Sequence, residues 1–95
     1  MTDPKLLILA SLADGDKHGY AIIQDVQQFA GIRLGAGTLY AAITRLEDLG
    51  WIRGLESEDR RKPYRITGLG RRSLEEQMGA LDRVVQTALR RLRTV

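Results

Sequence analysis

The side chains best suited to recognising another molecule lie on one face of the segment 35–50. At helical spacing this face carries Thr38, Tyr40, Thr44 and Arg45, which supply hydrogen-bond donors and one aromatic ring. A helix with such a face fits the major groove of DNA, where side chains read base edges. The same face would suit an ordinary solvated surface helix, so this segment alone leaves both interpretations open.

A second set of charged side chains lies between residues 57 and 65. Its basic members are Arg60, Arg61, Lys62 and Arg65. Cations that lie beside a groove-reading helix are suited to phosphates or to the minor groove. Glu58 and Asp59 partly offset this charge, and a solvated loop would also tolerate the cluster. The cluster therefore supports nucleic-acid binding without establishing it.

The triplet His18-Gly19-Tyr20 stands at the start of a predicted helix over residues 18–30. Free N–H groups and the helix dipole favour an anion, such as a phosphate, at a helix start. His18 has two interpretations, a helix-capping residue or a ligand, and capping is the simpler of the two.

The composition disfavours several classes of protein. The 95 residues suit one domain, and the net charge of +3 permits nucleic-acid binding. The absence of cysteine and the presence of a single histidine argue against disulfides and metal centres. No nucleophile–base or carboxylate pair stands out, so we expect neither an enzyme nor a cofactor. No apolar run approaches the roughly 20 residues of a membrane span, and no secretory signal is visible. We therefore expect a cytoplasmic protein with no membrane partner.

Three predicted helices position the candidate side chains. The first begins near Pro4 and is apolar almost all round, so we expect Leu6 and Leu9 to meet a second chain. The second covers residues 18–30, and a link at 32–34 that could form a one-bridge strand leads to the third. The apolar face of that third helix comprises Leu39, Ala42, Ile43, Leu46 and Leu49. This order predicts a helix-turn-helix.

Two short runs with alternating character follow, at residues 51–56 and 62–67. The polar, turn-rich segment between them indicates a β-hairpin. Pro63 indicates either that the second strand lies at a sheet edge or that the proline stands at the start of this strand. The predicted fold is mainly α with a small β-hairpin. It is a winged helix-turn-helix in which the hairpin is the wing, followed by a C-terminal helix that Thr67 can cap.

The last segment, 68–95, carries an apolar heptad repeat. Its members are Leu74, Met78, Leu81, Val85, Ala88, Leu92 and Val95. Such a repeat is typical of a seam between paired helices. A small winged module offers too little surface to cover this seam, so we expect a homodimer. Residues 1–67 would bind DNA and residues 68–95 would form the dimerisation helix, within one compact unit.

These motifs together resemble the PadR family of winged-helix transcriptional regulators. The matching segments are HGYAI (18–22), GTLY (37–40), RLE (45–47), GWI (50–52) and RKPYRIT (61–67), followed by Gly70. The resemblance covers residues 5 to 72 in motif and extends through the last helix in architecture. Most members of this family are bacterial, and most are repressors.

The resemblance implies a dimer whose third helices enter successive major grooves while the wings touch backbone or minor groove. It places Gly37, Thr38 and Tyr40 in the DNA-contacting motif, Tyr20 beside the phosphates, and Lys62 with Arg61 in the wing.

Two departures from the family pattern concern a helix cap and a drug-binding site. Gly35-Ala36 stands where a better capping residue is usual, so we expect no side-chain contact from the cap to phosphate. The last helix has no tryptophan, so sandwiching of a planar drug is not supported. A small-molecule effector of unknown identity remains open.

Two functions from different classes remain. The first is a sequence-specific DNA-binding transcriptional regulator, a repressor acting as a homodimer on a (pseudo)palindromic operator. The alternative is a winged-helix protein-interaction module that binds no operator, because the fold does not fix the function.

Overall fold

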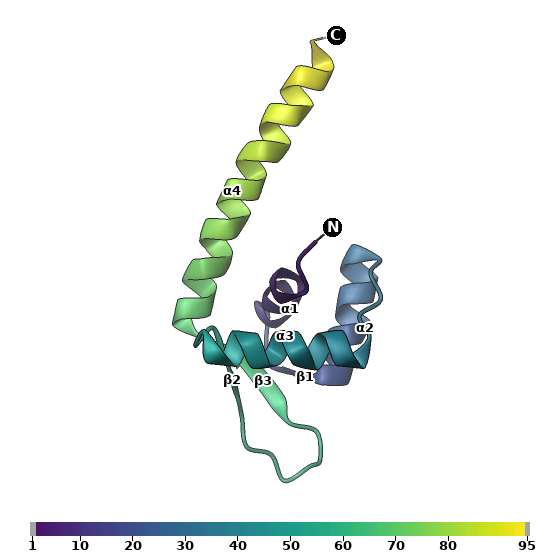
Figure 1. The fold of residues 1–95 in the computed structure, drawn as a ribbon, viewed down its shortest axis with the longest axis vertical. Coiled ribbons are helices and arrows are strands. Elements are labelled where there is room, and N and C mark those ends of the chain that lie inside the picture. The colour runs from purple at the N-terminus through teal and green to yellow at the C-terminus, as the bar shows by residue number, and fades with distance from the viewer. Residues whose placement is uncertain (1, 95) are drawn as a thin grey trace.

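The computed structural model describes residues 2–94. Met1 and Val95 lie outside this range, and Val95 is the last member of the predicted heptad repeat. The elements are α1 (Pro4–Leu12), β1 (Lys17–His18), α2 (Gly19–Ala30), α3 (Ala36–Asp48), β2 (Ile52–Gly54), β3 (Pro63–Ile66) and α4 (Gly68–Arg93). Figure 1 shows the first three helices gathered into one body, with the sheet and its loop beneath and α4 running away from it. The predicted winged helix-turn-helix, mainly α with a small β element, is confirmed.

The apolar face of α3 forms the centre of the core. Leu39, Ala42, Ile43 and Leu46 are buried, as their spacing predicts. Leu49 is 39% exposed, because α3 ends at Asp48 and Leu49 already belongs to its C-terminal cap. Gly50 follows with a φ of +75°, the left-handed conformation that commonly closes a helix.

The first helix is covered by its own chain, and this corrects one expectation. Leu7, Ile8, Leu9 and Leu12 are all buried, and Leu9 is 0% exposed. The helix α1 packs against α2, α3, β3 and the start of α4, so a second chain is not needed to cover it. Leu9 therefore cannot also supply a dimer contact. The other predicted residue, Leu6, is only partly buried and remains accessible.

The sheet has three antiparallel strands in the order β1-β3-β2, one more than the predicted hairpin. The strand β1 was missed because two residues between a turn and a helix show no periodicity. Lys17 pairs with Tyr64 and His18 pairs with Pro63, which makes β3 the central strand. Pro63 is thus at the start of its strand, as predicted, but not at an edge. The segment 32–34 forms no strand.

Alternation in the wing strands divides their side chains between two faces. Ile52, Tyr64 and Ile66 are buried against the helices, whereas Arg53 and Arg65 form an exposed cross-strand pair. The regular strands are shorter than the runs predicted for them.

The last helix begins on the body and then leaves it. Thr67 caps α4, since its Oγ1 accepts a hydrogen bond of 3.1 Å from the N–H of Gly70. Leu74 packs against the core, but the helix beyond it extends into the open, and the chain reaches 57 Å along its longest axis. The body therefore holds only the first turns of α4.

Candidate nucleic-acid interface

The outward face of α3 is exposed along its length. Thr38, Tyr40, Thr44 and Arg45 are all exposed. Thr44 donates its hydroxyl proton to the carbonyl oxygen of Tyr40 at 3.0 Å, which leaves the lone pairs of its oxygen free to accept from another molecule. The side chain of Arg45 makes no hydrogen bond or ion pair within residues 2–94, which leaves its donors available.

The start of α3 presents bare backbone to solvent. Gly35 is the N-cap and provides no side-chain hydrogen bond, as its lack of a side chain predicts. A Cβ placed on Gly35 or Gly37 would meet nothing within 4 Å. Free N–H groups at a helix start attract anions, and here a phosphate backbone could approach closely.

A groove of about 380 Å³ joins three elements that are far apart in the sequence. Its lining residues are His18, Gly19, Tyr20, Tyr40, Arg60, Arg61, Lys62 and Tyr64. They come from the first turn of α2, the outward face of α3 and the wing. Five predicted DNA-binding residues thus meet here: Tyr20, Tyr40, Arg60, Arg61 and Lys62. The other three lining residues, His18, Gly19 and Tyr64, were not predicted as site residues.

His18 caps α2, which was the simpler of its two interpretations. Its Nδ1 accepts a hydrogen bond of 3.3 Å from the N–H of Ala21. This bond satisfies one free donor of the first turn, and the ring also forms part of the groove wall.

Lys62 and Tyr64 form the wing side of the groove. The stem of Lys62 lies across Gly54 on the neighbouring strand, where a Cβ would overlap it. Its ammonium lies 5.8 Å from the ring centroid of Tyr64, within the range of a cation–π contact. Burial raises the pKa of Tyr64, with further contributions from Glu47 and Tyr40, so its hydroxyl stays protonated at neutral pH.

Arg65 does not join this group. Its Nε and Nη2 donate to the carboxylate of Asp16 at 3.0 and 2.7 Å, and it lies on the opposite face of β3 from Tyr64. The hydrogen bond from Arg65 lowers the pKa of Asp16 and raises that of Arg65 itself. This pair joins residues 49 positions apart, and no sequence pattern pointed to it.

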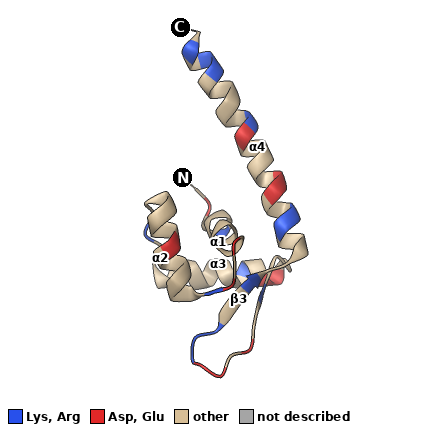
Figure 2. Cartoon of the chain, turned by 180° about the vertical axis from the view of Figure 1, so that it is seen from behind, with Lys and Arg blue, Asp and Glu red and all other residues tan. Residues whose placement is uncertain are grey.

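The wing loop carries both signs of charge on separate stretches. Figure 2 shows acidic residues on the part that leaves β2 and basic residues on the part that enters β3. Among the ion pairs of the described residues, none joins Glu58 or Asp59 to the wing cations. The arginines are therefore free to meet an external anion.

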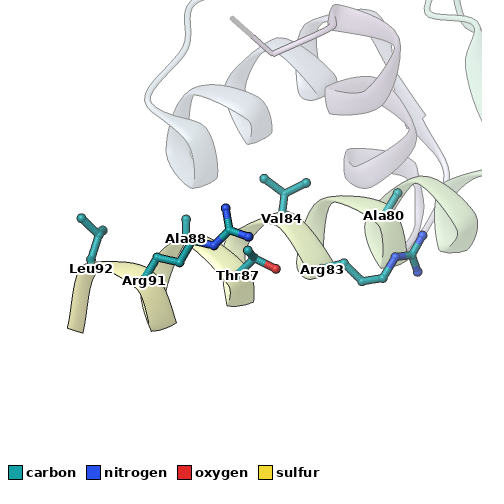
Figure 3. Close-up of a pocket in the computed structure, with 7 residues that line it drawn as sticks. All are labelled: Ala80, Arg83, Val84, Thr87, Ala88, Arg91 and Leu92. Carbon is teal, nitrogen blue, oxygen red and sulfur yellow. The ribbon is translucent and has the colours of Figure 1, made fainter. Parts of the chain in front are cut away.

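The apolar face of α4 is uncovered. Met78, Leu81, Val85 and Leu92 are exposed, Leu92 at 72%. A hollow of about 690 Å³ runs along a neighbouring stripe, lined by Ala80, Arg83, Val84, Thr87, Ala88, Arg91 and Leu92. Figure 3 shows Ala80, Val84, Ala88 and Leu92 pointing to one side of the helix. The apolar face is thus wider than the heptad repeat, because Ala80 and Val84 extend it on one side.

Residues 2–94 also bear on metal-binding and membrane-spanning proteins as alternative classes. In that range no group of three or more histidine or acidic side chains is placed to hold a metal ion. No helix there is long and apolar enough to cross a membrane.

Comparison with known proteins places the chain in a family. The model of the "Transcriptional regulator PadR-like family" matches residues 8–76. "Transcriptional regulator Rv3488" from Mycobacterium tuberculosis is 36% identical over 91 residues, covering 90% of this chain and 81% of that protein. A PadR family transcription regulator from hypervirulent Clostridium difficile R20291 superposes with a TM-score of 0.85 at 26% identity, over 96% of this chain and 99% of that one.

A third relative is much longer than this chain. An uncharacterized 37.1 kDa protein in transposon TN4556 from Streptomyces fradiae is 43% identical over 82 residues, which is 86% of this chain but only 24% of that protein. The same module thus makes up about a quarter of a larger relative. Since the family model covers most of the chain and the regulator relatives match nearly all of it, the chain belongs to the PadR-like family of transcriptional regulators, non-enzymatic winged-helix proteins that bind DNA.

Proposed function

We propose that this chain is a transcriptional repressor that acts in the cytoplasm as a homodimer on a (pseudo)palindromic operator. Residues 1–67 would bind one half-site, and residues 68–95 would pair the two copies. The observation that carries the proposal is the groove in which Tyr20, Tyr40 and the wing cations converge beside the exposed face of α3.

The outward face of α3 is assigned to the major groove. Thr38, Tyr40, Thr44 and Arg45 would reach base edges or adjacent phosphates, and Gly37 would let the DNA backbone approach the first turn. An exposed helix face that is already free of internal ion pairs needs little rearrangement to bind in this way.

The groove beside α3 is assigned to the sugar–phosphate backbone. Arg60, Arg61 and Lys62 supply positive charge, and Tyr20 supplies a hydroxyl near the start of α2. Such contacts fix the orientation of the protein on the duplex and make affinity depend on salt. Arg65 was expected in this set, but its pairing with Asp16 supports a different role.

The homodimer is supported by the uncovered face of α4. The proposed interface comprises Leu6, Leu74, Met78, Leu81, Val85, Ala88 and Leu92, with Ala80 and Val84 beside them. A second copy of α4 would remove this apolar surface from water. Charge favours an antiparallel pair, because Glu75 and Glu76 of one copy would then face Arg90 and Arg91 of the other.

The decisive experiment selects binding sites from random duplex DNA with the purified protein. We expect an inverted repeat with half-site centres about 10 base pairs apart, or a multiple of that. Affinity for it should fall steeply with salt, and a promoter carrying it should be repressed in a reporter assay. Failure to enrich any sequence, with only weak salt-sensitive binding, would contradict the proposal and favour the protein-interaction module.

A further inference from the structure

Gly19 occupies the point in the groove where a side chain has no room. It is the buried first residue of α2, directly after the capping His18. A Cβ placed there would lie 2.5 Å from the hydroxyl oxygen of Tyr40, 3.1 Å from Cζ of the same ring and 3.2 Å from Cδ2 of Leu39. Separations this short between carbon and its neighbours are repulsive, so an alanine would force one of the two side chains to move.

The two neighbours of Gly19 differ in their freedom to move. Leu39 is fully buried in the core, and it would have to yield only a few tenths of an ångström. Tyr40 is 50% exposed, so rotation of its side chain toward solvent is open to it. The strain would therefore displace the phenol of Tyr40 and leave the core in place.

The backbone does not need a glycine at this position. Within the described residues the glycines with positive φ are Gly15, Gly31 and Gly50, and Gly19 is not among them. Alanine could therefore adopt the conformation of Gly19 and would favour the helix. The requirement for glycine is then one of space, and the space is filled by Tyr40.

We propose that Gly19 is a positioning residue for DNA recognition, which keeps the phenol of Tyr40 over the first turn of α2. The start of α2 and the outward face of α3 then act as one unit, with the hydroxyl of Tyr40 held in the groove that also contains Lys62. This inference rests on the proposed DNA-binding function.

The test compares Gly19→Ala with a matched control, Gly68→Ala. Gly68 is likewise the first residue of a helix after a capping side chain, but a Cβ there meets only the end of Arg72, at 3.9 Å. We expect Gly19→Ala to weaken binding to the selected duplex about tenfold, the loss of one positioned contact. Gly68→Ala should leave affinity unchanged, and both variants should unfold at or above the wild-type temperature. A drop in the unfolding temperature of Gly19→Ala alone would overturn the proposal in favour of a structural role.

A second variant tests whether Gly19 acts through Tyr40. Tyr40→Phe removes the hydroxyl oxygen, the atom closest to the added Cβ. The double variant Gly19→Ala/Tyr40→Phe should therefore bind DNA as tightly as Tyr40→Phe alone. If the two losses multiply instead, Gly19 does not act through Tyr40 and the proposal fails.

A measurement without DNA separates this inference from the proposed function. The aromatic NMR signals of Tyr40, assigned by their loss in Tyr40→Phe, should move toward solvent-exposed values in Gly19→Ala and stay unchanged in Gly68→Ala. Unchanged Tyr40 signals in Gly19→Ala would refute the positioning role. If the wild-type protein binds no duplex, the proposed function fails, while these signals still decide whether Gly19 places Tyr40.

Discussion

The helices α3 and α4 are both amphipathic, yet their apolar faces end in different surroundings. The apolar face of α3 is covered by its own chain, with Leu39 and Leu46 at 0% exposure, which leaves its polar face exposed for the proposed DNA contacts. The apolar face of α4 is covered only near Leu74 and is bare beyond it. An apolar stripe therefore predicts that a helix face will be buried, but not which chain buries it.

The largest effect is expected from charges placed on the bare face of α4. In Leu81→Asp/Val85→Asp each carboxylate would enter the proposed interface without a partner. The protein should become monomeric by light scattering, and affinity for the full operator should fall roughly 100-fold or more, because the two half-sites are no longer bound by one linked molecule.

The control for this variant is Gln86→Asp, on the opposite side of α4. It adds the same kind of charge outside the apolar face and should leave the dimer intact. A dimeric Leu81→Asp/Val85→Asp protein would contradict the assigned interface.

The next largest effect is a loss of stability, expected from substitutions on the covered face of α3. Leu46→Ala leaves a cavity in the core of the body and should lower the free energy of unfolding by about 3 kcal/mol, measured by urea denaturation. The neighbouring Arg45→Ala should change it by less than about 0.5 kcal/mol, since Arg45 lies on the surface. Similar losses for the two variants would show that the faces of α3 are not divided as described.

Substitutions on the outward face of α3 should weaken DNA binding without lowering the free energy of unfolding. Tyr40→Ala and Arg45→Ala should each weaken binding to the preferred duplex by about 1–3 kcal/mol if the side chain reads a base. The loss should shrink on duplexes altered at the contacted base pair. Equal losses on all sequences would reassign these side chains to the phosphates.

Helix periodicity explains why most of the body could be predicted from the sequence. The buried face of α3, the cap at Thr67 and the alternation of Tyr64 with Arg65 follow from local spacing, and the structure contains all three. The strand β1 could not be found in this way, because its two residues are defined only by pairing with β3.

The candidate site was predictable in its residue types but not in its arrangement. Tyr20, Tyr40 and Lys62 each stood in a recognisable motif, whereas their convergence depends on packing between α2, α3 and the wing. The ion pair of Asp16 and the lack of space for a side chain at Gly19 were not predicted, because neither leaves a periodic signal in the sequence. That Leu9 is covered by its own chain was missed for a related reason, since an all-apolar helix does not reveal which neighbours cover it.

A smaller effect is expected at the tip of the wing. Arg60→Ala and Arg61→Ala should each weaken binding to all duplexes alike, and each should reduce the slope of log affinity against log salt by about 1. Lys5→Ala, on the far side of the body at the start of α1, serves as the control for loss of one positive charge. A loss that depends on the DNA sequence would indicate that the wing reads bases.

The smallest effect should come from the pair Asp16–Arg65, on the face of the sheet away from the groove. Hydrogen bonding from Arg65 lowers the pKa of Asp16 in the folded protein, so the pair stabilises the fold above the unfolded pKa, about 3.9. This stabilisation is lost as the pH falls through the lower, folded pKa. Asp16→Asn should therefore unfold at a slightly lower temperature than wild type at pH 7, and the difference should disappear in strong acid.

DNA binding by Asp16→Asn decides the role of Arg65. If Arg65 only anchors the loop before β1, affinity for the operator should be the same in wild type, Asp16→Asn and Arg65→Ala. If Arg65 contacts phosphate, as its place in the basic cluster suggested, Arg65→Ala should bind more weakly with a flatter salt dependence. Asp16 accepts hydrogen bonds from Nε and Nη2 of Arg65. In that case Asp16→Asn would release these donors for phosphate, and the variant should bind DNA more tightly. The face of β3 opposite Tyr64 would then belong to the DNA interface, and the division between the groove and the back of the sheet would have to be redrawn.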